Sequence, residues 1–292
     1  MWSCCLLCFD GGFSRIMLEP GFHLSFKVSK GRYCIGYTNL SSRADEGGSR
    51  DYWKEFNPCP HGAEVKRGIR CRTCSTRDVT RACLMCDGRE CHADPAIRRI
   101  CEGSVAYVYL ASFGEGMIKA GVSQGSRIPK RWIEQGADVA KRVLVGNGRE
   151  VRRFESRTQN ELDVLRRVKA EEKIDVLRSE RDLEESIRLL NIYEGKVHEH
   201  FPEAQHFHEE PRITYPYYRL NQLDKRPLEL KIRGGGEVSG RVLGVKGPIL
   251  LLEAMGLPRA INLRRLVGRR IDTDGVSRVK AQSDLDRFLS AT

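Results

Sequence analysis

Residues 59–101 hold seven cysteines and two histidines in a segment with few apolar side chains. Two Cys-x2-Cys pairs, Cys71 with Cys74 and Cys83 with Cys86, are separated by eight residues. This spacing lets both sulfurs of a pair reach one tetrahedral ion, and thiolates are preferred ligands of Zn²⁺. The segment therefore predicts structural zinc sites, in which no position is left for a substrate.

Eight ligands would complete two four-coordinate sites, so two Zn²⁺ ions are expected. The predicted ligands are Cys59, Cys71, Cys74, Cys83, Cys86, Cys91, His92 and Cys101. His61 is the alternative to His92, and sequential and interleaved sites both fit the spacing. A single zinc ion with spare cysteines, or an iron–sulfur cluster, would use the same residues. Four further cysteines lack ligand spacing and stay unassigned: Cys4, Cys5, Cys8 and Cys34.

The charge balance points to a polyanionic partner. Lys and Arg outnumber Asp and Glu by 50 to 39 in a chain of 292 residues, which favours DNA or RNA because each neutralised phosphate releases counterions. No apolar run approaches the ~20 residues that a membrane helix needs. The clustered cysteines and the absence of a basic leader favour a cytoplasmic protein. Met17 is an alternative start of the natural chain.

Composition and periodicity predict a multidomain α+β protein of five parts. Residues 1–57 read as a β-hairpin or small sheet behind an unassigned tail, and 58–102 form the zinc-binding module. Residues 103–158 alternate strand, turn, strand, helix and strand, which predicts a small mixed α/β core. Residues 159–202 predict a helical connector. Short strands separated by glycines predict a C-terminal, barrel-like β-domain over 203–292 with a final short helix at 283–289.

The core contains the run "VAYVYLASFGEGMIKAGVSQGSRIPKRW", residues 105–132. Two apolar strands flank a glycine-rich turn, and alternation places Tyr107 and Tyr109 on one face of the first strand. Gly121 predicts a close approach of the backbone to another group. Arg131 and Gln135 lie on one face of the helix that follows, at i,i+4 spacing.

This run resembles the core of the GIY-YIG endonucleases, a small mixed sheet flanked by helices. Its first motif falls on Tyr107-Val108-Tyr109, its second on Lys119-Ala120-Gly121, and its catalytic arginine on Arg131. Residues 59–158 more closely resemble an uncharacterised archaeal and bacterial family that joins a Cys-rich segment to such a core.

The resemblance implies a nuclease that hydrolyses phosphodiester bonds with Mg²⁺ or Mn²⁺. It implies that Glu155, or alternatively Glu150, holds the ion and that Arg131 stabilises the developing charge. Tyr109 or Tyr107 would orient or deprotonate water, and Lys119 would clamp phosphate or act as a base. The implied nucleic-acid contacts are Arg127, Lys130, Arg131, Arg152 and Arg153.

Three departures favour binding over cleavage. The first motif lacks its glycine, Lys119 replaces the second tyrosine, and Gln135 stands where a histidine often follows the arginine. The tyrosine and the histidine handle protons in the nucleases, whereas the basic side chains remain. The alternative function is a non-catalytic, zinc-containing DNA- or RNA-binding module, or a scaffold in a ribonucleoprotein or repair assembly. The histidine-rich run "HEHFPEAQHFHEE" has loose spacing and predicts a linker rather than a metal site.

Overall fold

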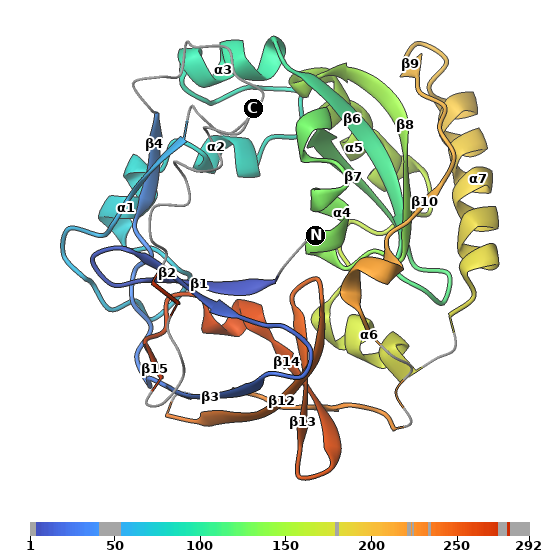
Figure 1. Ribbon diagram of the computed structural model, residues 1–292. Coiled ribbons are helices and arrows are strands. Elements are labelled where there is room, and N and C mark those ends of the chain that lie inside the picture. The colour runs from blue at the N-terminus through green and yellow to red at the C-terminus, as the bar shows by residue number, and fades with distance from the viewer. Residues whose placement is uncertain are drawn as a thin grey trace.

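The computed structural model describes residues 4–40, 54–178, 181–220, 223, 225–232, 235–273 and 279–280. These residues form a mixed α+β structure with several sheets (Figure 1). The α-helices in the described ranges are α1 Arg72–Arg77, α2 Arg81–Leu84, α3 Pro95–Glu102, α4 Lys130–Gln135, α5 Gly148–Glu161, α6 Ala170–Asp175 and α7 Leu183–His200. None of these helices is long and apolar enough to cross a bilayer.

The strands of the described residues divide into four sheets. The larger strands are β3 His23–Val28, β6 Val105–Ser112, β7 Ile118–Gln124, β8 Val139–Asn147, β12 Glu237–Lys246, β13 Ile249–Ala254 and β14 Leu257–Asn262. The shorter strands are β1 Cys5–Phe9, β2 Phe13–Met17, β4 Tyr37–Leu40, β5 Lys54–Asn57, β9 Gln205–His206, β10 Arg212–Ile213, β11 Leu228–Glu229, β15 Ile271–Asp272 and β16 Val279–Lys280.

A five-stranded sheet forms the predicted α/β core, with the strand order β10-β8-β6-β7 and β9 paired to β8. β6 and β7 form an antiparallel hairpin in which Tyr109 faces Gly121. β7 is the last strand of this sheet, so its outer edge borders the site described below.

Helices cover both faces of this sheet. α5 and α7 pack on one face, where Val108 and Leu110 of β6 meet Phe154 and Leu190. Trp132 of α4 packs on the opposite face against Tyr109. α6 and α7 lie within residues 159–202, where the sequence predicts a helical connector. α5 continues to Glu161, past the expected end of the core at residue 158.

A six-stranded sheet joins the two ends of the chain. Its order is β11-β14-β13-β12-β3-β15, and β3 pairs antiparallel with β12. Leu24, Phe26 and Val28 of β3 lie in the same core as Val238 and Leu250. β3 thus shares one sheet with strands of the expected C-terminal β-domain rather than forming a hairpin with the residues that follow it, whereas the hairpin of β1 and β2 lies in a separate sheet with β16.

The expected barrel is not found among the described strands, because this sheet is open and ends at β11 and β15. β12 and β13 instead form a long antiparallel pair with a register shift between Val242 and Gly244. The C-terminal helix expected at 283–289 lies outside the described residues.

The tip of the β12–β13 hairpin contacts the end of α4. A Cβ on Gly247 would lie 2.6 Å from the backbone nitrogen of Gly136, so the two glycines permit this approach. Beside it, Lys246 Nζ lies 2.8 Å from the carboxylate of Asp138, and both side chains are buried. Because α4 carries two residues of the site, the six-stranded sheet helps to fix its position.

Candidate functional site

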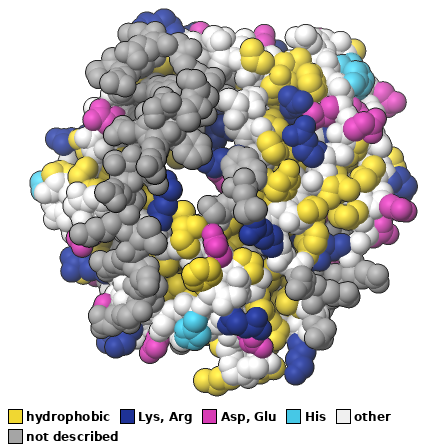
Figure 2. All heavy atoms as spheres, viewed as in Figure 1, with side chains coloured by type: hydrophobic (Ala, Val, Ile, Leu, Met, Phe, Trp, Pro, Cys, Tyr) yellow, Lys and Arg dark blue, Asp and Glu magenta, His cyan; other side chains and the backbone are white. Residues whose placement is uncertain are grey.

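A cleft of about 700 Å³ opens where β7 meets α4, α5 and the segment around α2. The space-filling view is hollowed beside α4, and Lys and Arg side chains lie at the margin (Figure 2). Four residues assigned catalytic roles by the sequence resemblance line this one cleft: Tyr109, Lys119, Arg131 and Glu155. The structure thus brings together side chains from two strands and two helices.

Tyr109, Gln135 and Lys119 form a hydrogen-bonded chain at the floor of the cleft. Gln135 Nε2 donates to the Tyr109 hydroxyl at 2.8 Å, and Lys119 Nζ donates to Gln135 Oε1 at 3.2 Å. Burial raises the pKa of Tyr109 to about 12, although Arg131 opposes the shift. Burial lowers the pKa of Lys119 to about 8, although Glu155 opposes it. Lys119 rather than Tyr109 is therefore the group that changes its charge near neutral pH.

Gly121 makes room for this arrangement. A Cβ at this position would lie 2.4 Å from the Tyr109 hydroxyl and 3.1 Å from Lys119 Nζ. No side chain fits there while Tyr109 keeps its place. The close approach that the sequence predicts at Gly121 is thus the phenol of Tyr109.

Glu155 is the partly buried carboxylate of the cleft. It lies on α5, and Gln159 Nε2 donates both to its Oε1 and to the carbonyl of Ala120 on β7, each at 3.2 Å. Burial raises the pKa of the Glu155 carboxyl, while Lys119 opposes the shift. The alternative residue, Glu150, accepts from the backbone N–H of Asn147 in the capping box of α5 and does not line the cleft.

The cleft is mainly basic. Its lining includes five basic side chains and two acidic ones, which are Lys119, Arg127, Arg131, Arg152, Arg166, Asp87 and Glu155. Arg127 and Arg131 also contact Glu134 at 3.1 and 3.9 Å. Two of the arginine and lysine residues that the resemblance implies as contacts, Lys130 and Arg153, are exposed outside this lining.

Tyr107 lies away from the cleft. Its ring packs edge-on against Phe207 with centroids 5.0 Å apart, and the Arg142 guanidinium lies 4.7 Å from the ring centre. Of the two tyrosines that the sequence offers for handling water, only Tyr109 therefore lines the cleft.

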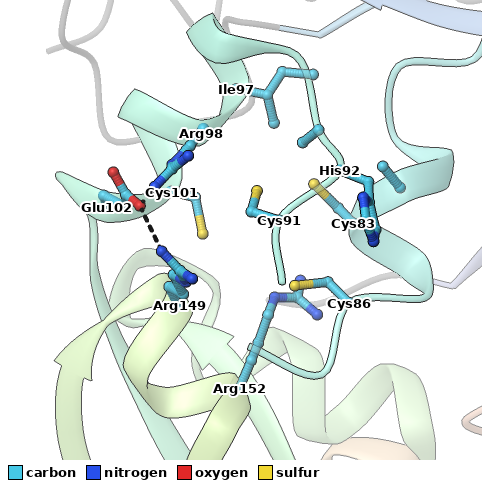
Figure 3. A pocket seen from close by; sticks show the side chains of 12 residues that line it. Cys83, Cys86, Cys91, His92, Ile97, Arg98, Cys101, Glu102, Arg149 and Arg152 are labelled. Carbon is cyan, nitrogen blue, oxygen red and sulfur yellow. Dashed lines mark hydrogen bonds and ion pairs between the residues drawn. The ribbon is translucent and has the colours of Figure 1, made fainter. Parts of the chain in front are cut away.

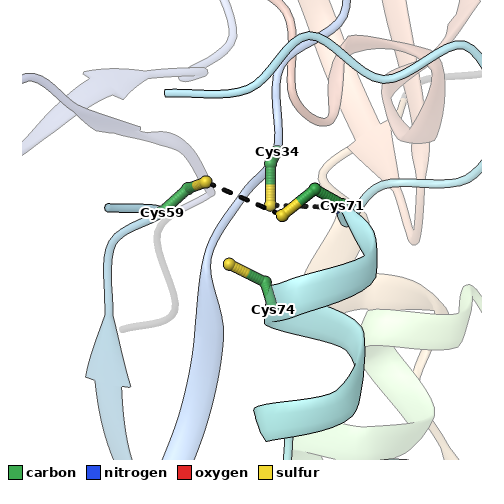
Figure 4. Close-up of side chains that lie close together, drawn as sticks. All are labelled: Cys34, Cys59, Cys71 and Cys74. Carbon is green, nitrogen blue, oxygen red and sulfur yellow. Dashed lines mark hydrogen bonds between the residues drawn. The ribbon is translucent and has the colours of Figure 1, made fainter. Parts of the chain in front are cut away.

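A separate group of four sulfurs lies beside β4, β5 and α1. Sγ atoms of Cys34, Cys59, Cys71 and Cys74 all lie within 4.8 Å of one another (Figure 4). Sulfurs bound to one tetrahedral zinc at ~2.3 Å stand roughly 3.8 Å apart, and Cys59 and Cys71 are separated by 3.9 Å. The four thiols could hold a metal ion such as Zn²⁺.

Backbone N–H groups support these sulfurs. The N–H groups of Cys71 and Gly36 donate to Cys34 Sγ at 3.2 and 3.4 Å. Burial raises the pKa of the Cys59 thiol, but hydrogen bonds from the backbone N–H groups of Ala63 and His61 act in the opposite direction. The resulting pKa is lowered to about 6. His61 thus acts on Cys59 through its backbone N–H group, and its side chain is exposed.

Cys34 is the member of this four-sulfur group that the sequence reasoning missed. It precedes β4 and Cys59 follows β5, and the two strands pair antiparallel with Tyr37 opposite Asn57. This register brings both cysteines to the same end of the hairpin. The signal in the sequence is one cysteine just before the first strand of a hairpin and another just after the second strand. The long polar loop between the two strands makes this hairpin hard to recognise from sequence.

The remaining cysteines of the Cys-rich segment gather at a second place. Cys83, Cys86, Cys91 and Cys101 line one small hollow between α2, α3 and the start of α5 (Figure 3). Burial raises the pKa of the Cys101 thiol, Arg152 opposes the shift, and the other three thiols add to it. The two cysteine groups follow one another along the chain rather than interleave.

His92 borders this hollow but points to solvent. Its side chain is 79% exposed, and its Nε2 lies 3.5 Å from a carboxylate oxygen of Glu90. With Cys34 in the first group, cysteines alone supply four sulfurs at each place. The four-sulfur group contains Cys34, which the predicted ligand set lacked, and does not contain His92.

The chain belongs to a family described as protein of unknown function (DUF2797), whose model matches residues 22–271. The match spans the cleft, both cysteine groups and most of the six-stranded sheet. Searches of curated proteins and of solved structures found no match. These comparisons give no link to the GIY-YIG nucleases.

Proposed function

We propose that this protein binds nucleic acid in the basic cleft and hydrolyses a phosphodiester bond there. The observation that carries the proposal is the composition of the lining, in which five basic side chains face two acidic ones. Such a concentration of positive charge in a concave site attracts a phosphate backbone. Two exposed apolar side chains, Leu84 and Met85, border the same cleft and offer contact to sugars or bases.

The residues present fit one divalent ion. Mg²⁺ is commonly bound by one or two carboxylates together with phosphate oxygens of the substrate, and Glu155 supplies a carboxylate among four arginines. When bound, the ion would polarise the phosphate and help to generate a nucleophile. Arg131 would stabilise the charge that develops on the phosphate.

Lys119 and Gln135 carry the remaining roles in the cleft. Lys119, with a pKa of about 8, contacts phosphate in its charged form and exchanges a proton near neutral pH. Gln135 fixes the positions of Lys119 and Tyr109 through its two hydrogen bonds. Gln135 stands where the GIY-YIG nucleases, in the resemblance, often have a histidine. In this proposal Gln135 holds its neighbouring side chains in position and does not transfer a proton.

We propose two structural zinc ions, one in each cysteine group. The second group adjoins the cleft, since Cys83, Cys86 and Cys101 line both the small hollow and the cleft. Gly88, between Cys86 and Cys91, packs against α5, where a Cβ would lie 2.4 Å from the backbone nitrogen of Arg153. An ion there would hold one wall of the cleft against the helix that carries Glu155.

A non-catalytic binding module is the second candidate, and one observation favours it. The Tyr109 side chain is only 1% exposed and its pKa is about 12. Such a phenol stays protonated at neutral pH and is a poor general base. In this case the cleft would bind the phosphate backbone of DNA or RNA without hydrolysing it.

The test compares cleavage and binding in cleft variants. Labelled single-stranded, duplex and hairpin DNA and RNA are incubated with zinc-replete protein, with and without Mg²⁺ or Mn²⁺. Glu155→Gln and Arg131→Ala alter the cleft, whereas Lys196→Ala is the control, because it removes an exposed cation of α7 outside the cleft lining. Circular dichroism and zinc content confirm that each variant is folded.

The outcomes separate the candidates. Metal-dependent cleavage that is lost in Glu155→Gln and retained in Lys196→Ala supports hydrolysis. Binding without cleavage, weakened about tenfold in Arg131→Ala and retained in Glu155→Gln, supports the binding module. Equal affinity in Arg131→Ala and Lys196→Ala would refute the cleft as the binding site.

A further inference from the structure

Three histidines meet where β9 pairs with β8, at the opposite edge of the five-stranded sheet from β7 and the cleft. His198 lies in the last turn of α7, His206 in β9, and His208 two residues beyond it. One ring nitrogen from each lies within 4.8 Å of the other two. α7 and β9 stand at the right edge of Figure 1, away from α1 and α2.

Two of these rings have their tautomers fixed by backbone carbonyls. His198 Nε2 lies 2.9 Å from the carbonyl oxygen of Val143, and His206 Nε2 lies 3.0 Å from that of Phe201. A carbonyl only accepts, so each Nε2 must carry the hydrogen and donate it. Nδ1 of each neutral ring then presents a lone pair, which is the arrangement that typically orients metal-ligating histidines.

The three imidazole rings pack directly against one another. Those of His198 and His206 are stacked with centroids 4.1 Å apart and planes 6° from parallel. His208 stands edge-on to His198 at 4.7 Å. Because the nitrogen lone pairs lie in the ring planes, at least one of the two stacked rings must turn before both Nδ1 atoms can reach one ion.

A partly buried carboxylate lies beside the three histidines. Glu194, one turn before His198 on α7, places Oε1 3.7 Å from His208 Nδ1. This oxygen is buried and has no hydrogen-bond partner among the described residues. The other carboxylate oxygen accepts from Lys141 Nζ, which Asn191 also binds, so the carboxylate is held in place. An unsatisfied buried oxygen is costly and calls for a partner.

We propose that His198, His206, His208 and Glu194 form a binding site for one divalent transition ion of the Zn²⁺ class. Imidazole nitrogens at ~2.1 Å and a carboxylate oxygen at ~2.1 Å are ordinary zinc ligands. Donor atoms around such a tetrahedral ion stand roughly 3.4 Å apart, so on binding the rings must close and one of the stacked pair must turn. The ion links the end of α7 to β9 at the edge of the sheet.

This site differs in chemistry from the cysteine groups. Nitrogen and oxygen donors produce no thiolate-to-metal charge transfer, so Co²⁺ bound here gives only weak visible d–d absorption. The test therefore uses full-length protein without a polyhistidine tag, with zinc already bound at its cysteines. Co²⁺ is titrated while absorbance is recorded, and bound metal is counted after desalting.

Two variants make the assignment. His208→Ala removes a ligand whose side chain is 74% exposed, so the fold is kept. His200→Ala is the matched control, because His200 lies on the same helix but its ring pairs with Glu161. We expect one Co²⁺ per chain in wild-type protein and in His200→Ala, and at least tenfold weaker binding in His208→Ala.

A second measurement is independent of the spectra. Zn²⁺ should raise the melting temperature of wild-type protein and of His200→Ala by stabilising the folded state, and should leave that of His208→Ala unchanged. If wild-type protein binds no Co²⁺ at millimolar concentration, or binds it as tightly in His208→Ala, the site does not exist.

Discussion

Gly121 is the position at which the smallest substitution should reveal how the cleft is built. Its φ lies outside the left-handed region, so space rather than backbone strain opposes a side chain. In Gly121→Ala the new Cβ would lie 2.4 Å from the hydroxyl oxygen and 2.5 Å from Cζ of Tyr109. Unstrained contacts between such atoms are about 3.5 Å, so the phenol must retreat by about 1 Å.

Tyr109 has little room to retreat. Its side chain is buried, its ring packs edge-on against the buried Trp132 with centroids 6.0 Å apart, and its hydroxyl accepts from Gln135. Overpacking of this kind costs about 1–3 kcal/mol, and loss of the hydrogen bond adds about 1 kcal/mol. We expect Gly121→Ala to lower the free energy of unfolding by roughly 2–4 kcal/mol.

Urea unfolding followed by circular dichroism measures this loss. The control is Gly195→Ala, an exposed helical position with open space around it, which should gain about 0.5–1 kcal/mol. Tyr109→Leu removes the colliding atoms, so the double variant should lose at least about 1 kcal/mol less than the two single losses together. Losses that add within about 0.5 kcal/mol would refute the proposed contact.

Three further predictions test other parts of the molecule. Cys34→Ser should reduce the zinc content by about one ion per chain, as counted by mass spectrometry of metals, whereas the exposed Cys5→Ser should leave it unchanged. Burial lowers the pKa of Lys119 to about 8, against the effect of its neighbouring carboxylate, so this cation is lost as the pH rises. Affinity for an oligonucleotide should fall by up to about tenfold between pH 7 and 9, and Lys119→Arg should flatten the profile measured by fluorescence anisotropy. Lys246→Met leaves a buried carboxylate without its main partner and should cost about 3 kcal/mol in urea unfolding, whereas the exposed Lys231→Met should cost almost nothing.

The local parts of the fold were predictable because their signals are local. Alternation along 105–112, the glycine turn after it and the helical spacing at 130–135 each specify an element without reference to distant residues. The convergence of Tyr109, Lys119 and Arg131 followed from a resemblance that covers a single hairpin and helix. These residues are close in sequence, so few alternative arrangements exist.

The parts that sequence did not predict depend on distant partners. β3 alternates like any half-buried strand, and alternation does not say which strand will lie beside it. Cys34 has no cysteine near it in sequence, and only the pairing of β4 with β5 brings it to Cys59. The histidines around His206 have irregular spacing, and they meet only because β9 turns back along β8.

The pairing of β3 with β12 also sets an order of events during synthesis. Lys27 faces Glu237, roughly 200 residues later in the chain, so β3 leaves the ribosome long before its partner exists. Local hairpins and helices such as those of the core form early, whereas pairings of high sequence separation form slowly. Leu24 and Phe26 must remain uncovered during this interval, exposed to chaperones and to other nascent chains. The six-stranded sheet, and with it the support of α4 by the β12–β13 hairpin, can therefore be completed only after most of the chain has been synthesised.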